Sequence, residues 1–171
     1  MPFALRAARP DDEPFLWAML HEAAHAAEEG IADPSGLRAV PELARYVDGW
    51  GRPADLGVVG GDAVLLGAAW LRLLTGEEPG YGYVDDATPE LAVAVAPEVR
   101  GAGLGTSLLT RLLDDAAERF DAVCLSVRGD NPARRLYERL GFVAMGEHEV
   151  ADRGRNPLAS VTMVRRLRHR A

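Results

Sequence analysis

Residues 90–109 constrain the fold of this chain most tightly, because their pattern changes from strand to helix across a glycine-rich turn. Leu91, Val93 and Val95 alternate with small alanines, which is the period-two pattern of a strand with one packed face. From Leu104 onward, leucines recur at helical spacing while arginine, aspartate and glutamate occupy the opposite face. The stretch therefore predicts a strand, a tight turn and an amphipathic helix.

The turn itself contains Gly101, Gly103 and Gly105. Glycine has no side chain, so the backbone can approach a ligand closely at these positions. A helix that begins there also presents free N–H groups and the positive end of its dipole to that ligand. The turn therefore predicts a binding position for phosphate or pyrophosphate.

Three kinds of phosphate-binding loop compete for this turn. A Walker loop requires a lysine, and the chain contains none, since all 19 of its basic residues are arginines. A Rossmann fingerprint requires glycine at position 106, which is Thr106. The third pattern, Arg/Gln-x-x-Gly-x-Gly/Ala, is matched from Arg100 to Gly105. This segment resembles the acetyl-CoA loop of the GNAT N-acetyltransferase superfamily, although an ordinary strand-to-helix turn could carry the same short motif.

A second motif lies one helix and one strand further on, at residues 131–142. Asn131 is suited to cap a helix, whose buried face would hold Ala133, Leu136 and Leu140, and Gly141 is suited to end it. The segment resembles the second conserved GNAT pattern. The residues that carry this resemblance are Asn131, Ala133, Leu136, Tyr137, Gly141 and Phe142.

The two motifs in this order identify the chain as a member of the GNAT superfamily, with a resemblance that runs from about Leu5 to Leu167 and is weakest across residues 30–55. It implies one α/β domain over residues 1–171. Its mixed, mostly antiparallel sheet would have about six to seven strands and about four helices, with splayed central strands holding acetyl-CoA. The implied activity is direct transfer of the acetyl group to a primary amine. A non-catalytic acyl-CoA-binding sensor with the same fold is the alternative, and the use of longer acyl-CoA molecules stays open.

The resemblance also implies roles for individual residues. Tyr137 would be the general acid for the leaving thiolate, and Glu90 the general base for the amine, directly or through a water. Asp85 and Asp86 are alternatives to Glu90. The implied contacts to acetyl-CoA are the strand edge at Val93, Ala94 and Val95, the polar side chain of Asn131, and the turn made of Arg100, Gly101, Ala102, Gly103, Leu104, Gly105 and Thr106.

Composition narrows the class of protein. A hydrophobic content of 48% over 171 residues supports a packed core, and no apolar run reaches the length of a membrane span. With no signal peptide recognised, we expect a cytoplasmic protein without membrane partners. The net charge of −7 argues against nucleic acid as a partner and favours a small cationic amine as the substrate, with a protein N-terminus also open.

Cys124 lies in a buried strand pattern, so we expect an inert thiol. The edges of the last strands could support a homodimer.

A competing motif lies near the N-terminus, where residues 21–25 read His-Glu-Ala-Ala-His. On a helix this spacing can place two imidazoles on a zinc ion with the glutamate as base, which gives a zinc-dependent hydrolase as a further alternative. Such sites need a third ligand. His148 is distant in the sequence, and Glu42 is the only well-placed remote carboxylate. We therefore expect no metal.

Strand and helix patterns predict the remaining elements. They place strands at 3–6, 56–59, 63–74, 121–127, 142–150 and 158–167, helices at 15–29 and 41–49, and an acidic, glycine-rich loop at 75–89.

Overall fold

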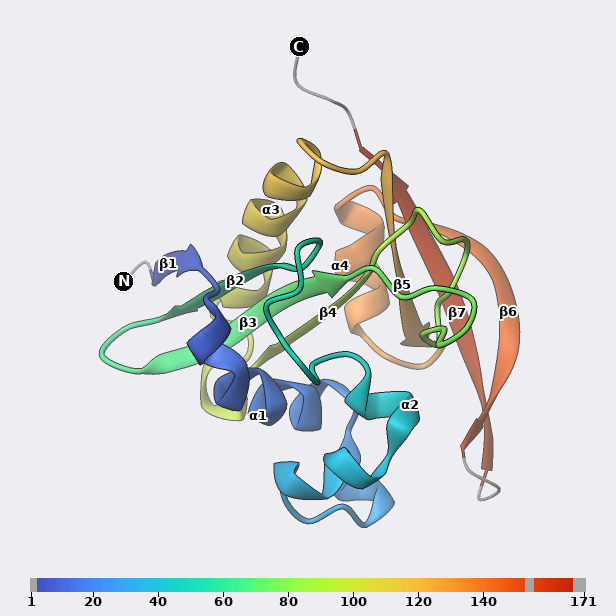
Figure 1. The fold of residues 1–171 in the computed structure, drawn as a ribbon, viewed down its shortest axis with the longest axis horizontal. Helices are drawn as coiled ribbons and strands as arrows, with labels where there is room; N and C mark the ends of the chain where they lie inside the picture. Colours follow the sequence, from blue (N-terminus) through green and yellow to red (C-terminus); the bar gives the residue numbers. More distant parts are fainter. Residues whose placement is uncertain (1–2, 153–155, 168–171) are drawn as a thin grey trace. The chain divides into compact units, whose positions relative to one another are not determined.

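The computed structural model describes residues 3–152 and 156–167 (Figure 1). The chain divides into two compact units, which are described in turn. Unit 1 comprises Met1–Arg72 and Leu91–Asp115, and unit 2 comprises Leu73–Glu90 and Ala116–Ala171. Across the described ranges the chain forms seven strands and four α-helices.

Unit 1 is built on the strands β1 (Ala4–Ala7), β2 (Leu56–Gly61), β3 (Leu65–Arg72) and most of β4 (Glu90–Val95), in the order β1-β2-β3-β4. β2 pairs antiparallel with both β1 and β3. The predicted hairpin is present, and a register shift between Gly60 and Gly61 lies next to its turn. Its two strands form the long green ribbon of Figure 1.

The two faces of the β2–β3 hairpin are covered by different elements. Gly60 pairs with Gly67, and a Cβ built on Gly67 would lie 3.0 Å from the side chains of Leu104 and Leu108 of α3 (Leu104–Ala116). Trp70 belongs to the opposite face, because residues three apart on a strand point to opposite sides. Its indole N–H donates to the carbonyl oxygen of Tyr46 at 3.0 Å.

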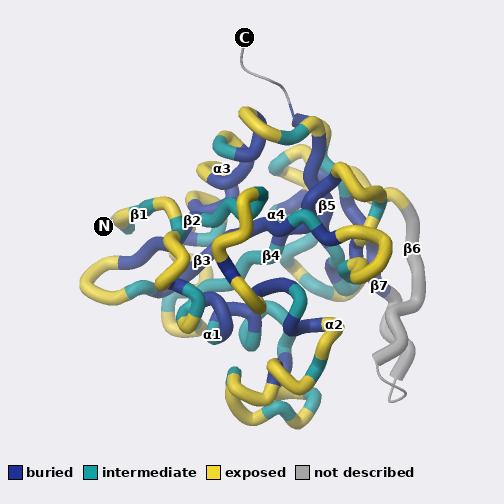
Figure 2. The backbone as a smooth tube through the Cα atoms, in the orientation of Figure 1, coloured by how far each residue is buried: buried dark blue, intermediate teal, exposed yellow. Residues whose placement is uncertain are grey.

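Burial follows the helical pattern on α3. Leu108, Leu109 and Leu112 are fully buried, while Thr110 and Arg111 are exposed. Figure 2 shows this alternation along α3. The amphipathic helix that the sequence predicts after the glycine turn is therefore confirmed, with its leucines in the core of unit 1.

Two helices of unit 1 are shorter than the sequence predicts. α1 (Glu13–Ala23) ends well before residue 29, because His25 has the left-handed backbone angle φ 50° that no α-helix can contain. A 3₁₀ turn, η2 (Ala26–Glu29), follows it. α2 (Pro41–Ala44) is a single turn rather than a helix over 41–49. Three further 3₁₀ turns are η1 (Pro10–Asp12), η3 (Pro34–Ala39) and η4 (Pro97–Val99).

Unit 2 contains β5 (Ala122–Arg128), β6 (Val143–Asp152), β7 (Asn156–Arg166) and α4 (Ala133–Arg139). β7 pairs antiparallel with both β5 and β6, which confirms the predicted final hairpin (Figure 1). Residues 153–155, in the expected turn, lie outside the described residues. Glu90, the first residue of β4, also belongs to unit 2, where it pairs in parallel with Cys124.

The predicted fold class is confirmed. The structure has a mixed α/β organisation, mostly antiparallel pairing, seven strands and four α-helices. None of the helices in the described ranges is both long and apolar enough to cross a membrane.

Candidate active site

β4 is the last strand of unit 1, and β3 is its neighbour there. Just after β4 ends, the N–H of Ala96 donates to the carbonyl oxygen of Leu66 at 2.7 Å. Val93, Ala94 and Val95 are half-buried. In the described part of unit 1 no strand follows β4 on its other side, and β4 pairs with β5 of unit 2 at Glu90.

The glycine loop connects η4 to α3 in unit 1. Gly101 and Gly103 have the left-handed φ values 81° and 89°, and a Cβ built on either would meet nothing within 4 Å. These two glycines are therefore required by backbone conformation rather than by a neighbouring protein group, and the surface above them is open. The loop has the room that an approaching anion needs.

The start of α3 supplies donors beside these glycines. The first hydrogen bond that closes the helix runs from the N–H of Ser107 to the carbonyl oxygen of Gly103, at 3.1 Å. The N–H groups of Leu104, Gly105 and Thr106 precede that bond, so they have no acceptor within the helix. The side chain of Leu104 is buried. Of the predicted contact residues, Leu104 can therefore offer a ligand only its backbone.

Arg100, at the start of the loop, has a partner that the sequence did not reveal. Its Nη2 lies 3.2 Å from Oε2 of Glu22, the penultimate residue of α1. The two residues are 78 positions apart in the chain, so no local pattern could have predicted the pair.

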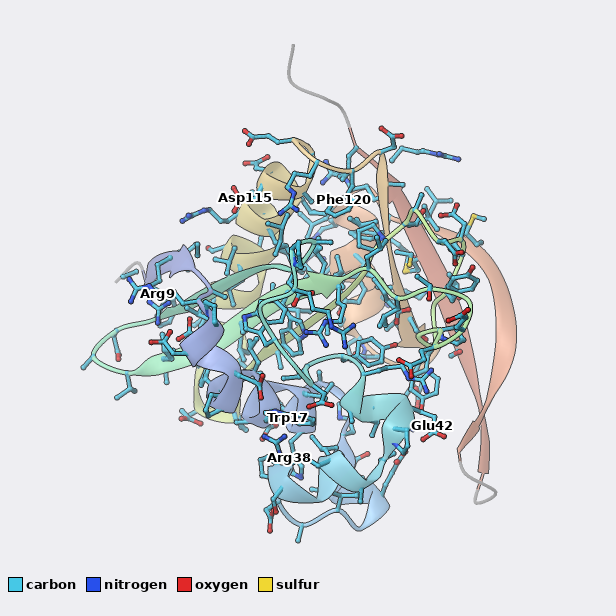
Figure 3. The ribbon with its side chains drawn as sticks, viewed as in Figure 1. Arg9, Trp17, Arg38, Glu42, Asp115 and Phe120 are labelled. Carbon is cyan, nitrogen blue, oxygen red and sulfur yellow. The ribbon has the colours of Figure 1, made fainter. Side chains whose placement is uncertain are left out.

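The His-Glu-x-x-His segment does not adopt the geometry that a zinc site requires. α1 ends at Ala23, so His25 lies beyond the helix with a left-handed backbone. Nε2 of His21 donates to the carbonyl oxygen of Ile31 at 2.7 Å, and Glu42 lies exposed on α2 (Figure 3). Among the described residues, no three histidine, cysteine, aspartate or glutamate side chains gather into a possible metal site.

In unit 2, Glu90 is buried and anchors the acidic loop. Its Oε1 accepts the N–H of Gly82 at 3.0 Å. A Cβ built on Gly82 would lie 2.7 Å from the carbonyl carbon of Leu125 in β5, so only glycine fits there. The carbonyl oxygen of Pro89, the residue before Glu90, accepts the N–H of Cys124 at 3.0 Å. One weak signal in the sequence pointed to this turn, a glycine between two tyrosines.

Asp85 and Asp86 organise the same loop. The hydroxyl of Thr88 donates to Asp85 at 2.8 Å, and this bond, with one from a backbone N–H, lowers the pKa of Asp85. The hydroxyl of Tyr83 donates to Asp86 at 2.6 Å and lowers its pKa in the same way. A carboxylate with a lowered pKa accepts a proton less readily at neutral pH. The geometry therefore favours Asp85 and Asp86 as loop anchors.

Tyr137 is the buried residue of α4. Burial raises the pKa of its phenol to about 12, and its ring meets Phe142 edge-on with centroids 6.0 Å apart. The predicted buried face was wrong on this helix, because Ala133, Leu136 and Leu140 are only half-buried. The helical pattern identified the apolar residues, but the packing of unit 2 selects the tyrosine.

Asn131 and Cys124, also in unit 2, behave as the sequence predicts in structural terms. Oδ1 of Asn131 accepts the N–H of Ala133, the first residue of α4, at 2.9 Å. Cys124 is fully buried in β5, and burial raises the pKa of its thiol. This environment makes the thiol unreactive, as expected.

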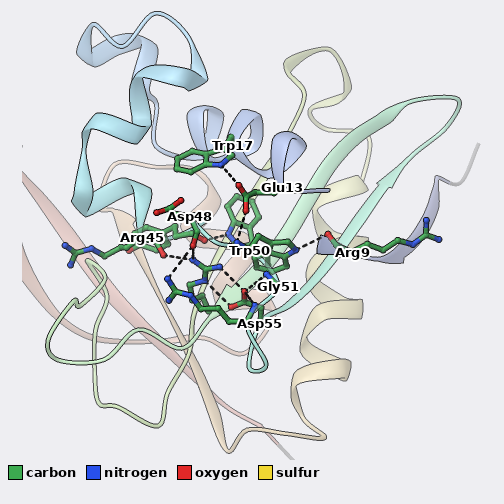
Figure 4. Close-up of polar contacts among 12 residues, drawn as sticks. Arg9, Glu13, Trp17, Arg45, Asp48, Trp50, Gly51 and Asp55 are labelled. Atoms are coloured by element: carbon green, nitrogen blue, oxygen red, sulfur yellow. Dashed lines mark hydrogen bonds and ion pairs between the residues drawn. The ribbon is translucent and has the colours of Figure 1, made fainter. Parts of the chain in front are cut away.

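A buried polar cluster fixes the segment between α2 and β2 in unit 1 (Figure 4). Arg72, at the end of β3, donates from Nε and Nη2 to the two carboxylate oxygens of Asp55, at 3.1 and 2.9 Å. Its Nη1 donates to the carbonyl oxygens of Arg45 and Asp48, at 3.1 and 2.6 Å. The two side chains are only 1% and 3% exposed. This ion pair has hydrogen-bond partners on both sides, so it can persist without water.

Glu13 ties α1 to the same segment of unit 1. Its carboxylate accepts the backbone N–H of Trp50 at 2.9 Å and the indole N–H of Trp17 at 3.3 Å (Figure 4). The guanidinium of Arg38 lies 4.4 Å from the ring centroid of Trp17 (Figure 3). These contacts hold the irregular segments that follow α1 in one arrangement.

Comparison with known proteins places this fold in one class, the GNAT acetyltransferases. The model of the Acetyltransferase (GNAT) family matches residues 16–142, which is more than half of the chain and includes parts of both units. The chain therefore belongs to the GNAT acetyltransferase family.

Individual relatives agree with this assignment. A mycothiol acetyltransferase from Kineococcus radiotolerans is 36% identical over 143 residues, which are 81% of this chain and 42% of the relative. The chain thus spans less than half the length of that relative. A ribosomal-protein-alanine N-acetyltransferase from Brucella melitensis superposes with TM-score 0.71 at 24% identity, covering 96% of this chain and 99% of its own. A phosphinothricin acetyltransferase from Sinorhizobium meliloti, in complex with acetyl-CoA, gives 0.69 at 20% identity, covering 98% and 90%.

Proposed function

We propose that this chain transfers an acetyl group from acetyl-CoA directly to a primary amine, and that both units together form the acetyltransferase domain. The observation that carries the proposal is the open glycine loop at the start of α3, where Gly101 and Gly103 leave the backbone unobstructed. The chain belongs to the GNAT family, and the resemblance of residues 100–105 to the acetyl-CoA loop of that family suggests the ligand that this loop binds.

The proposed cofactor contacts use the backbone of unit 1. The N–H groups of Gly101, Gly103, Leu104, Gly105 and Thr106 bind the pyrophosphate together with Arg100, because a helix start attracts negative charge. Ala102 keeps this turn in shape, since its own N–H donates to the carbonyl oxygen of Val99. The edge of β4 at Val93–Val95 pairs with the amide groups of the pantetheine arm. From unit 2, Asn131 supplies a polar contact while its Oδ1 accepts the N–H of Ala133. Acetyl-CoA supplies the activated acetyl thioester.

Tyr137 is the proposed general acid. Its pKa of about 12 keeps the phenol protonated throughout the physiological range. As the amine nitrogen bonds to the carbonyl carbon, the carbon–sulfur bond breaks and the phenol gives its proton to the departing sulfur. A solvent proton then restores the phenol.

The amine must lose a proton before or during its attack. We propose that Glu90 accepts it, directly or through a water, while it holds Gly82 in place through Oε1. Asp85 and Asp86, whose pKa values are lowered, stay ionised and attract a cationic amine.

The acceptor that the charge of the chain favours is a small cationic amine, because the net charge is −7. The names of the relatives suggest three further probes. These are the desacetyl form of mycothiol, a peptide with an N-terminal alanine, and phosphinothricin. Spermidine represents the cationic amines. A homodimer through the last strands stays a prediction, which light scattering of the purified chain can test.

The first experiment is a calorimetric titration with acetyl-CoA, with NADH as the control nucleotide. We expect micromolar binding of acetyl-CoA and none of NADH. Release of free thiol is then measured with each of the four amines. The absence of acetyl-CoA binding would refute the proposed function, whereas binding without turnover on any amine would leave the acceptor to be found among other amines.

A further inference from the structure

We propose that Glu22 competes with the phosphate groups of CoA for Arg100, and so sets the affinity of the glycine loop for its ligand. The proposal rests on the proposed function, because it assigns a role to a residue beside the same loop. Glu22 belongs to the His-Glu-x-x-His segment, whose histidines do not form the helical pair of a zinc site. A different role for its carboxylate follows from the contact that it makes.

The geometry places a negative charge beside an anion-binding loop. Oε2 of Glu22 lies 3.2 Å from Nη2 of Arg100, the first residue of the loop. Both side chains remain open to solvent, since that of Glu22 is 33% exposed and that of Arg100 is 57% exposed. Arg100 is therefore accessible to an incoming phosphate, which carries more charge than a carboxylate and matches the guanidinium fork equally well.

The pair is not needed to shape the loop. Backbone bonds hold it from within: Arg100 N–H donates to the carbonyl oxygen of Pro97 at 3.3 Å, and Ala102 N–H to that of Val99 at 3.2 Å. The left-handed angles of Gly101 and Gly103 set the remaining turn. An exposed ion pair adds little stability to such a loop. Glu22 instead affects ligand binding in two ways. It adds a negative charge near the incoming phosphate, and its ion pair with Arg100 must break before Arg100 can bind that phosphate.

The test is the dissociation constant of CoA measured by calorimetry on the full chain. Glu22→Gln keeps the size of the side chain and removes its charge. We expect CoA to bind about two- to fivefold more tightly to this variant at low salt, since exposed ion pairs are worth that much. Glu22→Ala should change the affinity in the same direction. The gain should shrink as the ionic strength is raised toward 0.5 M, because salt screens exposed charges.

A double-mutant cycle asks whether Glu22 acts through Arg100. Arg100→Gln alone should weaken CoA binding, and adding Glu22→Gln to it should bring a clearly smaller gain than in the wild type. Asp115→Asn is the matched control. It removes one negative charge from the exposed pair that Asp115 forms with Arg111, at 3.6 Å, near the other end of α3. This control should leave the affinity unchanged.

The outcomes separate the two proposals. If the wild type does not bind CoA, the proposed function fails and this inference fails with it. If the wild type binds CoA but Glu22→Gln and Glu22→Ala bind equally well or more weakly, only this inference is overturned. An equal gain in the Arg100→Gln background, or from Asp115→Asn, would also overturn it, because the effect would then be one of net charge. Thermal melts of each variant confirm that it is folded.

Discussion

Replacing Asp55 by alanine should destabilise this chain strongly. The carboxylate accepts two N–H groups of Arg72 and the backbone N–H groups of Gly51 and Arg52, at 3.0 and 2.9 Å. Without it, the guanidinium of Arg72 stays buried at 1% exposure, and among the described residues it donates only to the carbonyl oxygens of Arg45 and Asp48, which carry no full charge. A buried charge that loses its counter-charge is among the costliest changes in a protein.

The magnitude follows from this environment. Removing one partner of a buried ion pair costs about 3–5 kcal/mol. Gly51 and Arg52 are exposed, so water can replace Asp55 as the acceptor of their N–H groups. The loss of these two hydrogen bonds therefore adds little to the free-energy cost. Against a typical total stability of about 5–15 kcal/mol, the loss is large. It corresponds to a melting temperature lowered by about 6–20 °C for a chain of this length.

Urea unfolding and calorimetric melts of Asp55→Ala measure this loss. Asp115→Ala is the control, because it breaks an ion pair whose two side chains are each 42% exposed, and it should cost at most about 0.5 kcal/mol. Arg72→Met combined with Asp55→Leu removes both charges. It should cost less than the two single changes added together. If Asp55→Ala costs no more than Asp115→Ala, the buried pair does not hold this segment and the reasoning is wrong.

Three further predictions concern catalysis and ligand binding. Tyr137→Phe should lower the rate of thiol release about tenfold or more, with CoA affinity nearly unchanged. An unchanged rate would exclude the tyrosine as acid. In the wild type, turnover should not fall on the basic side until the pH approaches the phenol pKa of about 12. Glu90→Gln should flatten the acid limb of the pH–rate profile, where the protonated base is inactive. Gly82→Ala, whose Cβ would lie 2.7 Å from the Leu125 carbonyl carbon, should displace the acidic loop but keep an acid limb, because Glu90 is still present. An unmoved limb in Glu90→Gln would exclude Glu90 as base. Gly103→Ala should weaken CoA binding, because φ is 89° there and an L-residue is strained by about 1 kcal/mol or more; unchanged affinity would mean that the loop does not need this conformation.

The elements that the sequence predicted well are those whose pattern is local. Alternation along residues 90–95, leucine spacing after Leu104 and the strand patterns at 142–150 and 158–167 each report the environment of one segment, so the strands and α3 could be located directly. The glycines at 101 and 103 predicted a tight turn for the same reason, since backbone sterics act within a few residues, and the structure gives both of them left-handed angles. These features, with the second motif at 131–142, were sufficient to identify the family.

The selection of Tyr137 as the buried residue of α4 was decided by tertiary packing. So were the contacts of Glu22 with Arg100, of Gly82 with Leu125, and of Asp55 with Arg72. Each of these three pairs joins residues at least 17 positions apart. A one-dimensional pattern shows which side chains are polar or small, but it does not show which strand or loop they will face. That depends on how strands pair and helices pack, because only packing brings distant atoms within a few ångströms and removes the water between them.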